Sequence, residues 1–296
     1  MLNRMPNRCR PVLTALVLAG TFEAMAADGL SWLRQMQQAQ RYSTVEGVAV
    51  YAHDGRIDAI RILHQPGPDE QGQFANLGGD RRQLLRSGDQ VLVQMEGATV
   101  GAWPAFARFE SADADHVGKL YDVREIGKDK VAGLEAVVVL AEPRDELRFV
   151  QQIWFDRASG LILGNVVLDQ RRQPLEQVMF TTVRTSSALA SGALPEAIPE
   201  RATQASSIAL NLPAGFMFVA ERRDNYRHLD QFLLTDGLAL VSIYREARPA
   251  PTQGDFASRR GAVNLYGRQG ADLRWVAIGN VPLPTLRELI ESNAGP

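Results

Sequence analysis

The sequence predicts a mainly β protein with a few helices (α+β), built as a large, strongly curved antiparallel sheet followed by a smaller α+β domain. Two observations predict this fold class. Residues 149–184 contain three apolar runs of about eight to ten residues separated by short polar turns, the pattern of a three-stranded antiparallel meander. Further β-like runs lie on both sides, and Gly-containing turn signals connect neighbouring runs as hairpins. A large sheet of sequential hairpins curves into a barrel or part of one.

Both faces of the predicted meander are apolar. In its first strand, Phe149, Ile153 and Phe155 share one face, whereas Val150 and Trp154 share the other. A sheet with one solvated face alternates apolar and polar side chains, so something must cover the second face of this sheet. The cover is either the protein's own helices and loops or an apolar ligand in a half-open groove, and the residues leave both readings open.

The first 26 residues have the pattern of a secretory signal peptide. Three arginines precede the short apolar run 12–20, and the small-x-small motif Ala24-Met25-Ala26 follows as a cleavage site. The apolar run is too short to span a bilayer as a helix. The single cysteine, Cys9, lies in this segment, so the mature chain has no cysteine for a disulfide or for thiol chemistry. We expect a soluble protein in the periplasm, exported by a cleaved signal peptide.

Residues 28–41 are predicted to form a helix that covers the large sheet. Asp28 can cap its N-terminus, and Trp32, Met36 and Ala39 recur with helical spacing, which makes one stripe of the helix apolar. That stripe packs into the core or lines a ligand groove, and both can be true. Strand-like runs follow at residues 43–52, 56–64, 81–86, 90–95, 119–126 and 131–141.

Residues 97–118 interrupt this series of strands. They contain Trp103, Phe106 and Phe109 among Gly and Pro, and exposing three large aromatic side chains to water is costly. The segment therefore either plugs the concave face of the sheet or forms a movable lid over a ligand. Residues 104–110 could form a short helix with Phe106 and Phe109 on one face.

The segment 186–207 is predicted to be a linker, because it is rich in Ala, Ser and Pro and has no apolar period. It separates a large domain, residues 27–185, from a small domain, residues 208–296.

In the small domain we expect a polar loop at 247–260 and a terminal helix at 285–292. Thr285 and Glu288 have the spacing of a capping box at the start of that helix. The strands of this domain are expected at residues 216–221, 228–234, 238–246, 261–267 and 273–279.

The sequence contains no motif that indicates catalysis. Nucleophile-elbow, zinc-protease, phosphate-loop and calcium-loop patterns are all missing. The four histidines are scattered, and none has a second ligand at metal spacing. The formal net charge of −2 argues against broad nucleic-acid binding. We therefore predict a binding protein, with no catalytic residue, no metal site and no cofactor.

Four arginine doublets are the clearest charged features. Solvated turns account for most of them, but one or two could bind an acidic partner peptide or lipid phosphates. The doublets are Arg81-Arg82, Arg171-Arg172, Arg222-Arg223 and Arg259-Arg260.

A set of short motifs occurs in a fixed order between about residues 30 and 293. The motifs lie at residues 42–51, 61–64, 131–133, 153–156, 159–161, 175–180, 212–216, 228–229, 236–239, 261–266 and 279–282. No single motif is specific, but their order and spacing together resemble the MucB/RseB family of periplasmic sigma-factor regulators. The chain departs from the family pattern at Asn280, where an acidic residue is expected, and in the length and sequence of residues 98–117.

This resemblance implies both a fold and a function. The large domain is expected to be similar to the lipoprotein carriers LolA and LolB, a half-barrel with helices on its concave face that senses lipid. The small domain is expected to bind the periplasmic domain of a membrane-spanning anti-sigma factor and to shield it from site-1 proteolysis. Mislocalised lipid, such as lipopolysaccharide acyl chains, would then release it. The family thus implies a negative regulator of the envelope-stress sigma factor.

The alternative function is a periplasmic lipid or lipoprotein carrier or chaperone, which would need only the large domain. The missing motifs disfavour an envelope hydrolase, and the formation of a homodimer is left open. The candidate residues for lining a lipid groove are Trp32, Met36, Trp103, Phe106, Phe109, Trp154 and Phe180. The candidate residues for partner binding, expected around the edges of the small domain, are His228, Phe232, Tyr244 and Arg245.

Overall fold

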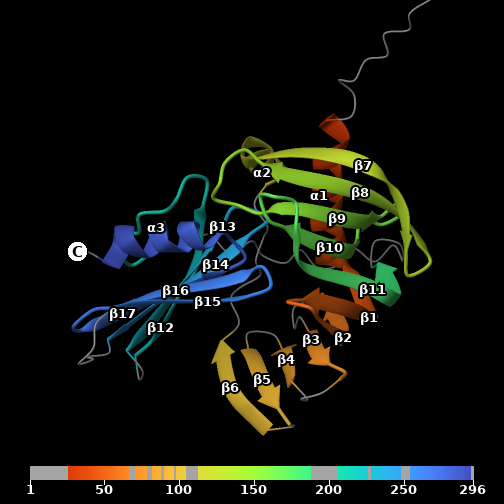
Figure 1. Cartoon of the computed structure of the whole chain (residues 1–296). Helices are drawn as coiled ribbons and strands as arrows, with labels where there is room; N and C mark the ends of the chain where they lie inside the picture. Colours follow the sequence, from red (N-terminus) through yellow and green to blue (C-terminus); the bar gives the residue numbers. More distant parts are fainter. Residues whose placement is uncertain are drawn as a thin grey trace, which may run out of the picture.

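The computed structural model describes residues 26–66, 71–78, 82–87, 90–96, 98–104, 113–187, 206–225, 228–247 and 254–294. These residues form two antiparallel sheets and three helices (Figure 1). We call the first sheet with α1 and α2 the large unit, and the second sheet with α3 the small unit. The predicted fold class is confirmed. No helix within these ranges is long and apolar enough to cross a membrane.

The first sheet has eleven strands among the described residues, in the order β6-β5-β4-β3-β2-β1-β11-β10-β9-β8-β7. Neighbours in this order are also neighbours in sequence, except that β1 pairs with β11. The strands are β1 (Ser43–His53), β2 (Arg56–Gln65), β3 (Gln71–Asn76), β4 (Arg82–Ser87), β5 (Gln90–Met95), β6 (Ala98–Pro104), β7 (Tyr121–Val131), β8 (Leu134–Pro143), β9 (Val150–Asp156), β10 (Ile162–Leu168) and β11 (Pro174–Ser187). The predicted meander is therefore confirmed as β9, β10 and β11.

The region of β3 to β7 differs from the sequence prediction in three places. β3 reads QGQFAN and is half-exposed, so it has no apolar alternation that would predict a strand. β6 lies inside the aromatic segment 97–118, and residues 105–110 of the helix expected there lie outside the described residues. The strand expected from residue 119 begins at Tyr121, because α2 (Ala114–Leu120) precedes it with Asp113 as its N-cap.

One face of the meander is covered by helices. α1 (Ala26–Tyr42) contacts α2, β7 and β8, and it crosses the back of this part of the sheet in Figure 1. Leu33 and Met36 are buried in a core with Val139 and Phe155. The predicted helix and its apolar stripe are thus confirmed as a cover of the sheet.

The second face of the meander is covered by the sheet itself. The indole nitrogen of Trp154 in β9 donates to Asp129 Oδ2 in β7 at 2.9 Å. Trp154 also shares a core with Val131 and Leu134, which flank the turn of the β7–β8 hairpin. β7 contacts β11 although β10, β9 and β8 lie between them in the sheet. The sheet therefore curls far enough to bury the surplus apolar face of the meander.

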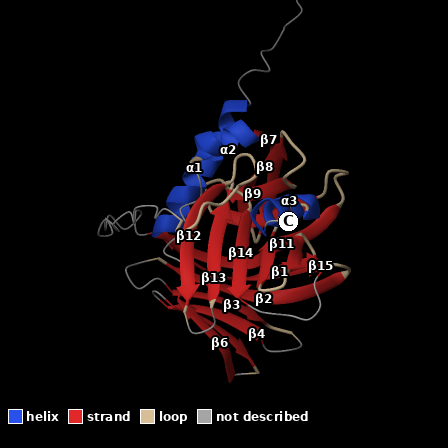
Figure 2. Cartoon of the chain, turned by 90° about the vertical axis from the view of Figure 1, so that its left-hand side faces the viewer, coloured by secondary structure: helices blue, strands red, loops and turns tan. Residues whose placement is uncertain are grey.

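The second sheet has six strands among the described residues, in the order β12-β13-β14-β17-β16-β15. α3 (Leu283–Ala294) covers one face of this sheet and lies apart from α1 and α2 in both views (Figure 1 and Figure 2). The core between them contains Phe232, Ile243, Leu286 and Ile290. The strands are β12 (Met217–Asp224), β13 (Leu229–Thr235), β14 (Leu240–Ala247), β15 (Gly254–Arg260), β16 (Val263–Gln269) and β17 (Leu273–Gly279).

Two local predictions for the small unit are wrong. The expected polar loop 247–260 contains the edge strand β15, whose side chains are all exposed, so that it lacks the alternation of a half-buried strand. The hydroxyl of Thr285 does not cap α3, which begins at Leu283; it donates to the carbonyl of Leu147 in the large unit at 2.9 Å. Asn280 Oδ1 accepts a hydrogen bond from the Leu240 backbone N–H at 2.8 Å.

Candidate functional site

The two units meet around Arg148, which lies between β8 and β9 and is completely buried. Its Nε donates to Asp236 Oδ2 at 2.8 Å, and Asp236 lies in the turn between β13 and β14, also completely buried. Its Nη2 donates to the carbonyl of Ala214 at 2.5 Å, and its Nη1 pairs with Asp145. The guanidinium also lies over the ring of Phe216, 4.9 Å from the centroid. Arg148 thus joins the units with every nitrogen engaged.

Asp236 is held from both sides of this interface. The hydroxyl of Tyr121 in the large unit donates to Asp236 Oδ2 at 2.8 Å. Burial, together with the Asp236 carboxylate, raises the pKa of Tyr121 well above its ordinary value. The other oxygen, Oδ1, accepts from the backbone N–H groups of Leu238 at 2.9 Å and Ala239 at 2.6 Å. One carboxylate therefore shapes the β13–β14 turn and binds it to the large unit.

A second contact joins the turn after β15 to the large unit. The N–H of Gly261 donates to Asp54 Oδ2 at 2.8 Å, and the N–H of Ala262 donates to Glu176 Oε2 at 3.1 Å. Gly261 has a φ of +57°, and a Cβ there would lie 2.8 Å from Glu176 Oε2. Glycine is needed at this turn for both reasons. With the Arg148 contact, this turn fixes the small unit at two places.

The large unit also has an apolar sheet face that leads out of its core. Ile62, Phe74 and Leu84 are direct cross-strand partners from β2 to β4, and Met95 on β5 pairs with Arg82, two residues before Leu84, so the four share one face. Phe74 is 52% exposed, and Leu84 and Met95 are each 39% exposed. We define the apolar stripe as Ile60, Ile62, Phe74, Leu84 and Met95.

The inner end of the apolar stripe is Phe180. Phe180 pairs with Ala49 and is buried, and Ala49 pairs with Ile60 on β2. The ring of Phe180 occupies the space that a side chain at Gly47 would take, and Gly47 pairs with Ile62. One sheet face therefore runs from a buried core at Phe180 to exposed apolar side chains on β3, β4 and β5.

The structure divides the predicted groove residues among several places. Met36 is buried on the sheet-facing side of α1. On the same helix, Trp32 stacks on Phe155 of β9 with ring centroids 6.2 Å apart. Trp154 is buried under the β7–β8 hairpin, and Phe180 lies at the inner end of the stripe. Trp103 is in β6, whereas Phe106 and Phe109 lie outside the described residues. The exposed residues of the stripe were not predicted; Phe74, a single aromatic in a polar run, is the one local signal.

A row of charged residues crosses the α3-side face of the second sheet. Each member is the direct cross-strand partner of the next, so the row spans all six strands. Opposite charges on directly paired residues stabilise their register. This charged row runs Arg223, Asp230, Arg245, Trp275, Arg268 and Asp255.

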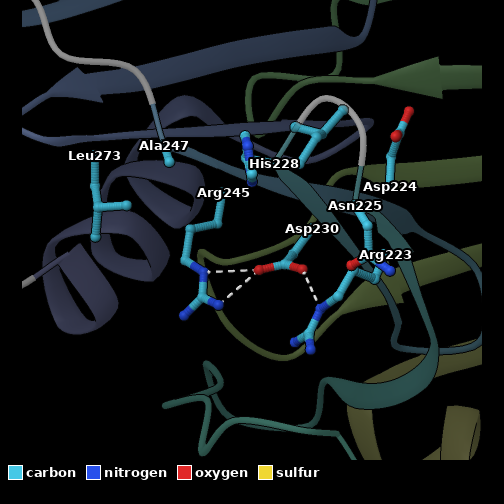
Figure 3. Close-up of a pocket in the computed structure, with 9 residues that line it drawn as sticks. Arg223, Asp224, Asn225, His228, Asp230, Arg245, Ala247 and Leu273 are labelled. Atoms are coloured by element: carbon cyan, nitrogen blue, oxygen red, sulfur yellow. Dashed lines mark hydrogen bonds and ion pairs between the residues drawn. The ribbon is translucent and has the colours of Figure 1, made fainter.

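One end of the charged row lines a pocket of about 390 Å³ (Figure 3). Asp230 Oδ1 accepts from Arg223 Nε at 2.7 Å, and Oδ2 accepts from Arg245 Nε at 3.0 Å and Nη2 at 2.6 Å. Burial raises the pKa of Asp230, but the hydrogen bonds from Arg223 and Arg245 outweigh it and lower the pKa below its ordinary value. Leu229, Ala247 and Leu273 form apolar walls.

Two of the four predicted partner-binding residues line this pocket, namely His228 and Arg245. Tyr244 points to the opposite face, where its hydroxyl accepts from Gln231 Nε2 at 3.0 Å. Phe232 is completely buried beneath α3 and is not available to a partner. The expectation that these residues mark the edges of the sheet is wrong, because β13 and β14 are inner strands and the edges are β12 and β15.

Comparison with known proteins gives matches over both units. The MucB/RseB N-terminal domain model matches residues 28–198, and the MucB/RseB C-terminal domain model matches residues 203–294. The sigma factor AlgU regulatory protein MucB of Pseudomonas aeruginosa is 28% identical over 299 residues, which cover 91% of this chain and 93% of MucB. The sigma-E factor regulatory protein RseB of Haemophilus influenzae is 22% identical, and the alignment covers 98% of each chain.

Solved structures give the same result. A chain of the MucA/MucB complex of Pseudomonas aeruginosa has a TM-score of 0.67 at 26% identity, covering 90% of this chain and 98% of that chain. The similarity therefore extends over both units, in the same order along the chain.

The interface predicts a large cost for losing Arg148. Arg148→Ala should lower the free energy of unfolding by about 3–5 kcal/mol, because it leaves Asp236 buried without its ionic partner. Urea unfolding of the full chain measures this. Arg124→Ala is the matched control: Arg124 also contacts two carboxylates, Asp122 and Glu142, but is 40% exposed, so we expect a loss within about 1 kcal/mol. Equal losses would contradict the assignment of Arg148 as the joint between the units.

The charged row predicts an acid-dependent stability. Hydrogen bonds from Arg268 and then Tyr266 lower the pKa of Asp255 to about 2. Because the pKa is depressed by folding, this carboxylate stabilises the fold above its unfolded value of roughly 4, and the contribution is lost as the pH falls toward 2. Asp255→Asn should therefore melt at a lower temperature than the wild type at pH 7, with the difference shrinking between about pH 4 and pH 2. A difference that is constant over this range would refute the contribution of the row.

Proposed function

The chain belongs to the MucB/RseB family, and from this premise we propose that it is a periplasmic negative regulator of an envelope-stress sigma factor. Its small domain binds the periplasmic part of a membrane-spanning anti-sigma factor and shields that part from site-1 proteolysis. Mislocalised lipid binds the large domain and releases the anti-sigma factor, which is then degraded. In this proposal residues 1–26 are a cleaved export signal, and a linker at 186–207, whose first two residues still belong to β11, joins domains 27–185 and 208–296.

The observation that supports this proposal most strongly is that two surfaces of different chemistry lie on units joined by a buried interface. The apolar stripe on the large unit suits acyl chains, whereas the charged pocket on the small unit suits a polar segment of a protein. The related MucB has been solved as a complex with MucA, a precedent for the protein partner.

The apolar stripe is the part of the large unit proposed to bind lipid. Phe74, Leu84 and Met95 present a row of exposed apolar side chains that water solvates poorly, so covering them with an acyl chain is favourable. Because this face continues to the buried Phe180, a chain lying on the stripe would reach the core beside β1 and β11. Two other predicted groove residues are buried, Trp154 in the meander and Met36 in α1, which argues against a lipid site on either face of the meander.

Release by lipid requires that the lipid bind one arrangement of the protein better than another. A ligand shifts an equilibrium only by its difference in affinity for the two states. Lipid and anti-sigma factor must therefore oppose each other reciprocally, each weakening the affinity for the other by the same factor.

A periplasmic lipid or lipoprotein carrier is the second candidate, and the exposed stripe favours it. A carrier would need only the large unit. It leaves unexplained why a small unit with its own pocket is fixed to the large unit through a completely buried ion pair.

Partner binding is tested with the full mature chain. We expect it to bind the purified periplasmic segment of an anti-sigma factor from the same organism saturably and to slow cleavage of that segment by the site-1 protease. A periplasmic segment of the same length from an unrelated inner-membrane protein is the control. If no anti-sigma segment of the organism binds, the regulatory function is refuted and the carrier remains.

The lipid surface is tested by the double variant Phe74→Ser, Leu84→Ser. It should bind lipopolysaccharide about tenfold more weakly or worse, because each lost apolar contact costs on the order of 1 kcal/mol. Its melting temperature should change little, since both side chains are already exposed. The control is Ile57→Ser. The Ile57 side chain is 77% exposed on the opposite face of β2, so this variant should bind lipopolysaccharide like the wild type. Equal affinities of the double variant and the wild type would exclude the stripe as the lipid surface.

A further inference from the structure

The pocket at the charged row is lined by two arginines, Arg223 and Arg245, and by two acids, Asp224 and Asp230. We propose that it binds an acidic side chain of the anti-sigma segment, an Asp or Glu next to an apolar residue, through the guanidinium of Arg245. This inference rests on the proposed function and names the chemistry by which the partner is recognised.

Arg245 is the member of the charged row whose positive charge is least compensated. It shares the single carboxylate of Asp230 with Arg223, which also reaches Glu221 at 3.5 Å. On the other side of Trp275, Arg268 contacts two carboxylates, those of Asp255 and Glu291. Among the described residues, Asp230 is the one acid that Arg245 contacts. A carboxylate supplied by a ligand would therefore give Arg245 a second acidic partner, as Arg268 already has.

The geometry holds Arg245 ready for such a carboxylate. Its Nε and Nη2 donate to the nearly buried Asp230, and its guanidinium lies 5.8 Å from the ring centroid of Trp275. These two contacts fix the plane of the guanidinium and leave Nη1 for a ligand. A prepositioned guanidinium forms strong hydrogen bonds to a carboxylate because little side-chain entropy remains to be lost.

The walls of the pocket indicate what lies next to the acidic group. Leu229, Ala247 and Leu273 line it, and Leu273 is 42% exposed, so an apolar ligand group would cover it. Figure 3 shows Leu273 and Ala247 on the same side of Arg245 and the Asp230–Arg223 pair on the other. A peptide segment with adjacent acidic and apolar side chains fits both sides of this pocket. A free phosphate would use the charge and leave the apolar wall in water.

Arg245→Gln tests the proposal in the full mature chain. It should weaken binding of the periplasmic anti-sigma segment at least tenfold, and the salt dependence of the remaining binding should be shallower than that of the wild type. Arg268→Gln is the matched control, because its side chain is 28% exposed against 26% for Arg245 and it lies in the same charged row outside the pocket. The control should bind within twofold of the wild type.

A charge-neutralising scan of the segment identifies the group that Arg245 holds. Each Asp or Glu is changed to Asn or Gln and measured against the wild type and Arg245→Gln. One of these changes in the segment should lower its affinity for the wild type at least tenfold, but its affinity for Arg245→Gln less than twofold. If the wild type binds but no acidic position couples to Arg245, or if inorganic phosphate alone displaces the segment, the inference is overturned while the proposed function stands. If the wild type does not bind the segment, both fail.

A second variant keeps the test informative if Arg245→Gln does not fold. Leu273→Asp places a negative charge at the exposed rim without removing any hydrogen bond of the row. Leu273→Asp should weaken binding of the segment at least tenfold, because it repels the acidic group and removes the apolar contact. Leu273→Lys removes the same apolar contact without the repulsion, so it should weaken binding far less. Equal affinities of these two variants would contradict an acidic ligand.

Discussion

The completely buried ion pair between Arg148 and Asp236 is the interaction on which the arrangement of the protein depends. Neither charge can remain inside without the other, because an unpaired charge in the interior costs several kcal/mol. The two residues belong to different units, so both are satisfied when the units are docked. If the units separate, water solvates both groups again. An interface of this kind can open and re-form, which an interface made of apolar side chains alone resists.

The charged pocket and the inner end of the apolar stripe each share a strand with a contact between the two units. In the small unit, the β13–β14 turn holds Asp236, and the other end of the same two strands carries Asp230 and Arg245. In the large unit, Glu176 contacts the small unit from β11, the strand that carries Phe180 at the inner end of the apolar stripe. Hydrogen-bonded strands are stiff, so a shift at either surface reaches the interface directly. This is a physical route by which lipid on one unit can change partner affinity on the other.

The sequence predicted those helices and strands whose apolar residues recur with a regular local spacing. The meander and α1 carry apolar residues with the period of their own secondary structure, so both were predicted. β15 and β3 were missed because a strand with water on both sides has no alternation. Arg148 and Asp236 are 88 positions apart, and no short motif connects them. Likewise, His228 and Arg245 were predicted for the partner site, but the pairing register that places Arg245 beside Asp230 and buries Phe232 is a property of the folded sheet.

The most direct test of lipid-controlled release is the affinity of the full mature chain for the periplasmic anti-sigma segment, measured by calorimetry with and without saturating lipopolysaccharide. If lipid releases the partner through the docked units, saturating lipopolysaccharide should lower the affinity for the segment at least tenfold. Saturating segment should then lower the affinity for lipopolysaccharide by the same factor. Equal affinities for the segment in the presence and absence of lipopolysaccharide would contradict this coupling.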